Sequence, residues 1–297
     1  IEKVRIIVLD NCSSIPVVDT LKKSGISLNN LTVIRHDQNI GINGNILECF
    51  RVCVTKWLWI LGDDDEVDKY ALRTINDKLQ STDDDVACLN FDSKVSSDFR
   101  KNIKRVMSLD ELPKCNAGYS SILFISTNIY NVNILKKYIG DGILFSYSFQ
   151  PHCAMLISCL IDKRGALITF PEKIVNWSDA SVLSWSTVHM SFARQTIFDL
   201  RGLRDHSSYP ILYNYIMKGY DNWKALLKLN DFFCSEDKGL ASKKYALQQT
   251  FRNVKKTPMS ILIFAFYTVI LKTNFTTIFF GKLFRLPISF YQKKANK

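Results

Sequence analysis

The chain has 297 residues, 47% of them hydrophobic, which suits one large domain or two and excludes a largely disordered protein. Its net charge is +11, but residues 251–297 carry nine Lys/Arg and no Asp or Glu, which leaves residues 1–250 nearly neutral and argues against a nucleic-acid-binding face there. The eight dispersed cysteines, without paired Cys-x-x-Cys elements, exclude a typical zinc site and fit a reducing compartment better than a disulfide framework.

Strand and helix signals alternate through the first 92 residues. The apolar run 4–9 predicts a central strand, and it ends at the turn 10–14, whose Asp, Asn and Ser side chains favour bonds to nearby backbone. Such an alternation is typical of an α/β fold with a mostly parallel sheet and helices on both faces. We expect strands at 4–9, 31–35, 57–61 and 86–91, and helices at 16–24, 45–55 and 68–79.

An acidic stretch follows the third of these strands. Residues 57–61 are apolar and predict a short strand buried on both faces, which a glycine ends. The carboxylates of Asp63, Asp64 and Asp65 come next, and three adjacent anions aimed at one point need a cation such as Mg²⁺ or Mn²⁺. A solvated acidic turn is the alternative, and we expect it for residues 83–85, which follow polar residues rather than a strand.

The pattern loosens over 93–118 into a charged insertion and then resumes. Ser148 and Pro151 predict the cap and first turn of an apolar helix. Glycines at 140 and 142 predict a turn, and Pro171 is expected to close the last strand. In chain order we expect a strand at 120–126, a short helix at 131–138, a helix from 151 to about 160 and a strand at 167–170.

The rest of the chain predicts a C-terminal helical appendage, with helices at 188–206, 209–230 and 237–254. The apolar stretch 259–271 has 13 residues, fewer than the ~20 that cross a bilayer. Aromatic and aliphatic residues mixed with Lys and Arg favour a helix lying in a membrane surface, and a buried C-terminal helix pair is the alternative. The expected organisation is a catalytic domain over 1–185, a helical region over 186–254 and a basic membrane-interface tail over 255–297.

Three loops are expected to meet at one edge of the sheet, because each follows the carboxyl end of a strand. They are the turn 10–14, the Gly/Asn-rich loop 39–45 and the acidic loop 62–66. Loops of this composition suit the base, ribose and phosphates of a nucleotide. The candidate nucleotide-binding residues are Asp10, Asn11, Ser13, Asn39, Gly41, Asn45, Asp63 and Asp64.

In their order and spacing these segments resemble the family-2 glycosyltransferases of the GT-A fold. The matching stretches are VLDNCSS at 8–14, NIGINGN at 39–45 and WILGDDDE at 59–66. The segment GYSSILFISTNIYN at 118–131 is similar to the acceptor-side strand of bacterial sugar transferases, in particular the abequosyltransferase-like O-antigen enzymes. The resemblance covers about residues 1–180 and implies a nucleotide-sugar donor, a divalent metal and sugar transfer to a hydroxyl.

The resemblance also implies roles for single residues. Asp10 is expected at the nucleotide base, Asp63 near the ribose or the sugar, and Asp65 on the metal of the diphosphate, with Asp63 and His152 as further candidate ligands. The metal neutralises the charge of the leaving nucleotide diphosphate. An inverting transfer then needs one base that deprotonates the acceptor hydroxyl.

The chain departs from the family pattern in two places. The family's first strand, with its Pro-x-Tyr-Asn type of motif, is missing and is expected to precede Ile1. The stretch 148–152 has no carboxylate where the family carries its acidic base. His152 is therefore the first candidate for the base, with a packing histidine as its alternative; Asp141 is the second candidate and Asp92 the third.

Together these features predict an enzyme that extends a lipid-linked glycan in bacterial surface polysaccharide synthesis. The basic tail places it on the cytoplasmic face of the inner membrane as a peripheral protein. The alternatives are a nucleotidyltransferase on a similar sheet and a non-catalytic membrane-associated protein on a decayed transferase fold. No nucleic-acid partner is expected, and a tail that acts as a nucleic-acid arm is a further alternative.

Overall fold

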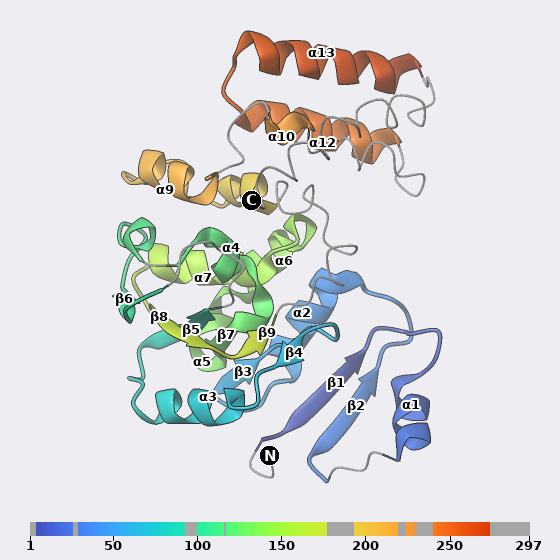
Figure 1. The fold of residues 1–297 in the computed structure, drawn as a ribbon, viewed down its shortest axis with the longest axis vertical. Helices are drawn as coiled ribbons and strands as arrows, with labels where there is room; N and C mark the ends of the chain where they lie inside the picture. The colour runs from blue at the N-terminus through green and yellow to red at the C-terminus, as the bar shows by residue number, and fades with distance from the viewer. Residues whose placement is uncertain are drawn as a thin grey trace, which may run out of the picture. The chain divides into compact units, whose positions relative to one another are not determined.

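The computed structural model describes residues 4–25, 29–92, 100–115, 117–176, 193–218, 224–227, 229 and 240–273. The chain divides into two compact units, which are described one at a time. The first holds residues 1–179 and 200–212, and the second holds residues 180–199 and 213–297. All strands of the described residues belong to the first unit (Figure 1).

The predicted alternation of strands and helices is present in the first 92 residues. Helix α2 begins at residue 41 rather than at 45, and the other elements lie close to their predicted places. The elements are β1 (Ile6–Asp10), α1 (Val17–Ser24), β2 (Leu31–Arg35), α2 (Gly41–Val52), β3 (Trp57–Trp59), β4 (Glu66–Val67), α3 (Ala71–Gln80) and β5 (Val86–Asp92).

Short helices and strands make up the rest of the first unit. They are β6 (Lys104–Val106), η1 (Leu112–Lys114), α4 (Tyr119–Leu123), η2 (Ile125–Thr127), β7 (Asn128–Asn131), α5 (Val132–Leu135), η3 (Lys136–Tyr138), α6 (Ile139–Leu144), η4 (Ser146–Ser148), α7 (Pro151–Ile161), β8 (Ala166–Lys173) and β9 (Val175–Asn176), where η marks a 3₁₀ helix.

The longest strands pair in parallel, β1 with β2 and β5 with β8. A five-stranded sheet has the order β3-β7-β5-β8-β6, in which β7 is antiparallel to β3 and β5, and β6 is antiparallel to β8. β4 and β9 form a short antiparallel pair. The parallel pairs join strands that are connected through helices, which is the connection that parallel strands require.

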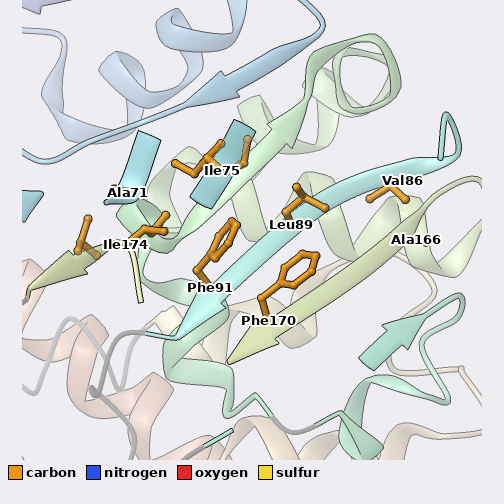
Figure 2. Close-up of a cluster of buried hydrophobic side chains, with 10 residues drawn as sticks. Ala71, Ile75, Val86, Leu89, Phe91, Ala166, Phe170 and Ile174 are labelled. Carbon is orange, nitrogen blue, oxygen red and sulfur yellow. The ribbon is translucent and has the colours of Figure 1, made fainter. Parts of the chain in front are cut away.

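Strand β5 lies at the centre of the core, and each of its residues is buried. On one of its faces Leu89 and Phe91 pack against α3, and Phe91 stacks on Phe170 with ring centroids 5.1 Å apart (Figure 2). On the other face Asn90 donates a hydrogen bond to the carbonyl of Ser121 in α4 at 3.0 Å. Helices therefore cover both faces of this strand, as the α/β pattern predicts.

Strand β3 is shorter and more exposed than predicted. It ends at Trp59 and lies at one end of the five-stranded order, where it pairs with β7. Its three residues are half-buried, and Leu61, part of the predicted strand, is 41% exposed. The prediction of burial on both faces is wrong, because an end strand is covered less than a central one.

The predicted strand at 120–126 is wrong, because α4 and η2 occupy this segment and the strand β7 begins only at Asn128. The amide of Asn128 donates to the carbonyl oxygens of Ile122 and Phe124 at 3.0 and 2.8 Å. These bonds satisfy carbonyl groups at the end of α4, which a helix end leaves without partners. A short apolar run does not by itself distinguish a strand from a buried helix.

The predicted turn at 140–142 is also wrong, because these residues lie inside α6. A Cβ atom on Gly142 would lie 2.8 Å from Cδ2 of Leu47 and 2.9 Å from Sδ of Met155. The glycine is therefore needed where α6 approaches α2 and α7 closely, rather than for a turn.

Proline marks the start of α7 as predicted, but Ser148 is not the N-cap of this helix. Pro151 is the first residue of the helix and Gln150 is its N-cap, whereas the hydroxyl of Ser148 donates to a carbonyl three residues earlier.

Pro171 does not close β8, which continues to Lys173. The pairing of β5 with β8 shifts register around this proline, and such an irregularity tolerates a residue without an N–H group.

The second unit is helical in its described residues. Its elements are η6 (Ile197–Asp199), the end of α9 (Tyr209–Ile216), α10 (Lys224–Leu227), α12 (Leu240–Asn253) and α13 (Pro258–Thr273). Leu247 of α12 and Tyr267 and Leu271 of α13 belong to one buried cluster, so helices on both sides of residue 255 share a core. Residues 188–192 of the predicted helix 188–206 and residues 274–297 of the predicted tail lie outside the described residues.

Candidate active site

Asp10, the last residue of β1, holds the first loop in place. Its carboxylate is 2% exposed, and it accepts hydrogen bonds from the backbone N–H of Ser13 at 2.8 Å, from the N–H of Val17 at 3.2 Å and from the guanidinium of Arg35. Arg35 lies opposite Asp10 in the parallel register of β1 and β2, and it also donates to the carbonyl of Ser13 at 2.8 Å. The turn after β1 is therefore fastened to the end of β2.

These donors, with the backbone N–H of Ser13 first among them, hold the pKa of Asp10 well below its ordinary value of 3.8. A carboxyl group whose pKa is lower in the folded state stabilises the fold above its ordinary pKa, and this contribution is lost as the pH falls further. We expect Asp10→Asn to unfold at a lower urea concentration than wild type at pH 7, and the difference to shrink below about pH 4. Asp19→Asn, at an exposed position of α1, is the control, and an Asp10→Asn difference that stays constant across the pH range would contradict the assignment.

The Gly/Asn-rich loop is tied to the same turn. The side-chain amide of Asn11 donates to Oδ1 of Asn39 at 2.9 Å, and Oδ1 of Asn11 accepts from the N–H of Ile40 at 2.9 Å. Oδ1 of Asn39 also accepts from the N–H of Gly41 at 2.8 Å. Gly41 has a φ of 75°, which glycine adopts without strain. Loops 10–14 and 39–45 therefore lie together, as predicted.

The start of α2 is held against this pair of loops by His36. Its backbone N–H donates to the carbonyl of Asp10 at 2.9 Å, and its Nε2 lies 3.2 Å from Oδ1 of Asn45 in α2. The first turn of a helix has backbone N–H groups without partners inside the helix, and such ends bind anions. The ends of β1 and β2 and the start of α2 together form a polar corner that suits a nucleotide.

The acidic loop is folded back over Gly62. A Cβ atom at this position would lie 2.9 Å from Oδ2 of Asp65 and 3.0 Å from Oδ1 of Asp64, so a larger residue would displace the carboxylate of Asp65 and crowd that of Asp64. The glycine therefore allows two carboxylate oxygens to gather over one point of the backbone. The structure places carboxylate oxygens of Asp64 and Asp65 over Gly62, and the ligand pair Asp63 and Asp65 stays a prediction.

Ser126 of η2 anchors this loop from another part of the chain. It is fully buried; its hydroxyl donates to Oδ2 of Asp65 and accepts from the N–H of Gly62 at 3.1 Å. The indole of Trp59 donates to the carbonyl of Ser126 at 2.8 Å. The end of β3, the acidic loop and η2 are thus joined around one serine, and Asp65 is held in a fixed orientation.

The environment of Asp65 fits a divalent cation. Burial raises the pKa of Asp65 most, the hydroxyl of Ser126 lowers it, and the neighbouring charges of Asp64 and Asp63 raise it again. A cation at this point removes the repulsion, and carboxylate oxygens suit Mg²⁺ or Mn²⁺. No three His, Cys, Asp or Glu side chains of the described residues form a complete metal cage. A pair of carboxylates fits a metal that takes its other ligands from water and a diphosphate.

The bond from Ser126 gives a testable pH dependence. A carboxylate must lose its proton before it binds a metal, and the hydroxyl of Ser126 lowers the pKa of Asp65. We expect Ser126→Ala to move the midpoint of Mn²⁺ binding to higher pH, measured as Mn²⁺ affinity from about pH 5 to pH 8. Ser148→Ala, which removes another buried hydroxyl, is the control. An unchanged midpoint in Ser126→Ala would show that the serine does not tune the carboxylate.

The second acidic triplet differs from the first, as the sequence predicts. Its side chains are exposed, and each has a cationic partner. Arg105 pairs with Asp83 at 3.1 Å and with Asp85 at 2.5 Å, and Lys56 pairs with Asp84 at 2.5 Å. Basic side chains already neutralise these carboxylates, so they do not need a metal ion.

His152, the first candidate for the base, is buried at the start of α7. The residue is 2% exposed, and its Nε2 lies 3.0 Å from the carbonyl oxygen of Leu123. Burial lowers the pKa of His152 to about 4, so the ring is neutral at pH 7. His152 does not form a metal group with Asp63 and Asp65 among the described residues. Its surroundings match the packing alternative, and its roles as base and metal ligand stay predictions that this geometry does not support.

Asp141, the second candidate, is more accessible than His152. It lies in the first turn of α6 and is half-buried. Its neighbour Gly142 packs against Leu47 of α2, the helix whose first turn belongs to the polar corner. Asp141 is thus a half-buried carboxylate on a helix that packs against α2, and it stays a candidate for the base.

Of the three predicted loops, 10–14 and 39–45 lie together. Two further residues hold the site and are not among the predicted ones, namely Arg35 and Ser126. Arg35 has a sequence signal, since it ends the strand predicted at 31–35, as Asp10 follows the strand predicted at 4–9. Ser126 has none, because its partner Asp65 is 61 positions away and the segment around it was predicted as a strand. The acidic loop is held by η2, whereas loops 10–14 and 39–45 are held by each other.

The chain matches one protein-family model and is similar to solved structures. The family model described as glycosyl transferase family 2 matches residues 1–149, half of the chain. No curated protein matches the chain in sequence. The crystal structure of S. aureus TarS 1-349 is similar, with a TM-score of 0.51, 15% identity and coverage of 84% of this chain and 71% of that one.

The same S. aureus protein has been solved with two ligands. The complex of TarS 1-349 with UDP has a TM-score of 0.53 and 15% identity, and covers 84% of this chain and 71% of that chain. The complex with UDP-GlcNAc has a TM-score of 0.53 and 14% identity, and covers 84% and 72%. The fold is therefore the one that the sequence resemblance implies.

Proposed function

The chain belongs to glycosyl transferase family 2, and from this premise we propose that it transfers a sugar from a nucleotide-diphosphate sugar to a hydroxyl group of a glycan, with a bound divalent cation and with inversion. The observation that carries the proposal is the pair of anchored features at strand ends. One is the polar corner formed by loops 10–14 and 39–45, and the other is the acidic loop around Asp65.

The polar corner is the part that we assign to the nucleoside of the donor. Asn11 and Asn39 hold the loops together, and Gly41 leaves the start of α2 free of a side chain. The oxygens of Asp10 are already engaged by Ser13, Val17 and Arg35. We therefore propose that Asp10 shapes the pocket for the base, in addition to any contact with the base itself.

The acidic loop is the part that we assign to the diphosphate. A bound Mg²⁺ or Mn²⁺ would neutralise the diphosphate as it leaves the sugar. Asp65 and Asp64 are the residues that would hold it, because their oxygens gather over Gly62 and their mutual repulsion favours a cation. Ser126 keeps Asp65 oriented toward that point.

Inverting transfer needs a base for the acceptor hydroxyl, and we propose Asp141. A base must reach the proton that it removes, and Asp141 is the accessible one of the two leading candidates. Its carboxylate takes the proton while the hydroxyl oxygen attacks the anomeric carbon, and the bond from that carbon to the nucleoside diphosphate breaks. We propose that the acceptor is a glycan carried on a lipid in bacterial surface polysaccharide synthesis, in line with the sequence resemblance.

A donor screen tests this function. The full chain is incubated with UDP-, GDP-, CDP- and dTDP-sugars, with Mn²⁺, Mg²⁺ or EDTA. The measured quantity is release of the nucleoside diphosphate, with water accepting the sugar in place of the glycan. We expect release from one nucleotide class, only with metal, and the UDP-sugars come first because the structurally similar TarS 1-349 has been solved with UDP-GlcNAc.

Two other outcomes would replace the proposal. Release of pyrophosphate from a nucleoside triphosphate would favour a nucleotidyltransferase. A folded chain that consumes no nucleotide sugar under any of these conditions would favour a non-catalytic role.

A further inference from the structure

Helix α13 in the second unit carries an exposed apolar face. Met259, Ile261, Leu262 and Val269 are 47, 52, 64 and 58% exposed, and Ala265 between them is exposed as well. Residues 261, 262, 265 and 269 follow helical spacing and share one side of the helix. Water is an unfavourable surrounding for a continuous apolar stripe of this kind.

The opposite face of the same helix packs against other helices of the second unit. Tyr267, Ile270 and Leu271 are buried in the cluster shared with α10 and α12. The rings of Phe264 and Phe251 stack with centroids 3.9 Å apart. α13 is therefore held firmly by one face while it presents the other, and polar substitutions on the exposed face leave the packing intact.

Exposed cations lie at the turn before α13, one of them, Lys256, over the ring of Phe251, and anions are absent from this part of the sequence. Arg252, Lys255 and Lys256 are exposed around the turn that leads into α13. Residues 240–273 contain six Lys/Arg and no Asp or Glu, and no acidic residue follows Asp237. The partner of the apolar face must therefore be apolar and must also carry negative charge.

We propose that α13 lies in the surface of an anionic lipid bilayer, with the side chains of its exposed face among the acyl chains and the basic residues against the lipid phosphates. Apolar burial and attraction to anionic headgroups are the two forces that hold such helices at the interface. No helix of the described residues has the length and apolar character needed to cross a bilayer. This binding does not depend on sugar transfer.

Charge favours a lipid surface over a second copy of the chain. A symmetric contact between two copies of α13 would bring its basic borders together. Neither copy has a carboxylate after Asp237 to pair with them. The same holds for residues 274–297, which add five Lys/Arg and no acid. An anionic surface satisfies both the apolar stripe and the cations.

Vesicle sedimentation of the full chain tests the proposal. We expect binding to phosphatidylcholine vesicles that contain phosphatidylglycerol, weaker binding to pure phosphatidylcholine, and a decline with salt. The double variant Ile261→Gln/Leu262→Gln should bind at least about tenfold more weakly, because two apolar side chains no longer enter the bilayer. Lys255→Glu/Lys256→Glu should also lose about tenfold or more.

The matched control is Ile143→Gln/Leu144→Gln, an adjacent exposed apolar pair on α6, which should bind vesicles like wild type. Circular dichroism confirms that each variant is folded. Equal vesicle binding by wild type and Ile261→Gln/Leu262→Gln would overturn the proposal, because another segment would then hold the membrane. If the wild type does not bind vesicles but forms a dimer, and Ile261→Gln/Leu262→Gln abolishes this dimer, the proposal is overturned in favour of a contact between copies.

Discussion

Replacement of Asp65 by Asn abolishes metal-dependent turnover of the nucleotide sugar, with an expected loss of about 10³-fold in kcat/KM. The substitution keeps the shape of the side chain and an oxygen that accepts from Ser126, but removes the charge that holds the cation. The measurement is nucleoside diphosphate release at saturating Mn²⁺.

The stability of Asp65→Asn separates function from folding. The pKa of Asp65 is raised in the folded state, chiefly by burial, so ionisation opposes folding above its ordinary value of 3.8. The variant should therefore be at least as stable as the metal-free wild type at pH 7. Asp83→Asn, in the acidic triplet that Arg105 and Lys56 neutralise, is the matched control and should keep full activity. A stable Asp65→Asn protein with normal metal-dependent turnover would remove the acidic loop from the mechanism.

Replacement of Asp141 by Asn lowers kcat by about 10²- to 10⁴-fold, the usual contribution of a positioned base. Affinity for the donor nucleotide stays near wild type, because the substitution leaves both the polar corner and the acidic loop untouched. The measurements are kcat for transfer to the acceptor and nucleotide binding by the same variant.

His152→Gln tests the competing base. The structure predicts mainly a loss of stability, because the ring is buried against the carbonyl of Leu123. Burial lowers the pKa of His152 from 6.5 to about 4, so the wild-type histidine favours folding above pH 6.5, and this contribution declines toward pH 4 as the unfolded chain takes up the proton. A stable His152→Gln protein that loses transfer, together with an active Asp141→Asn protein, would reverse the two assignments.

The fold can be predicted from the sequence where the local preferences of the residues agree with their positions in the structure. The alternation up to residue 92 and the turn after Asp10 lie where they are predicted, and Gly41 lies at the predicted entry to α2, although this helix begins at residue 41 rather than at 45. Each has residues whose backbone preference matches its position, such as the glycine at 41 with a φ of 75°. The contrast between the triplets 63–65 and 83–85 could also be predicted, because only the first directly follows an apolar run.

The sequence was insufficient where distant contacts decide the structure. Gly142 is a packing residue against Leu47 and Met155 rather than a turn residue, and no local pattern shows this. The segment before β7 is helical because Asn128 satisfies carbonyl groups at the end of α4. The role of Ser126 depends on a hydrogen bond across 61 positions. The burial of His152 is a further feature that the sequence does not reveal.

Calorimetric titration of nucleoside diphosphates, with and without Mn²⁺, tests most directly the claim that the acidic loop holds a metal-bound diphosphate. It is carried out with UDP, GDP, CDP and dTDP on the full chain and on Asp65→Ala. We predict that one nucleotide binds with Mn²⁺, that its affinity falls at least about tenfold without the metal, and that Asp65→Ala shows no difference between the two conditions. Equal affinity with and without Mn²⁺ in the wild type, unchanged in Asp65→Ala, would contradict the claim.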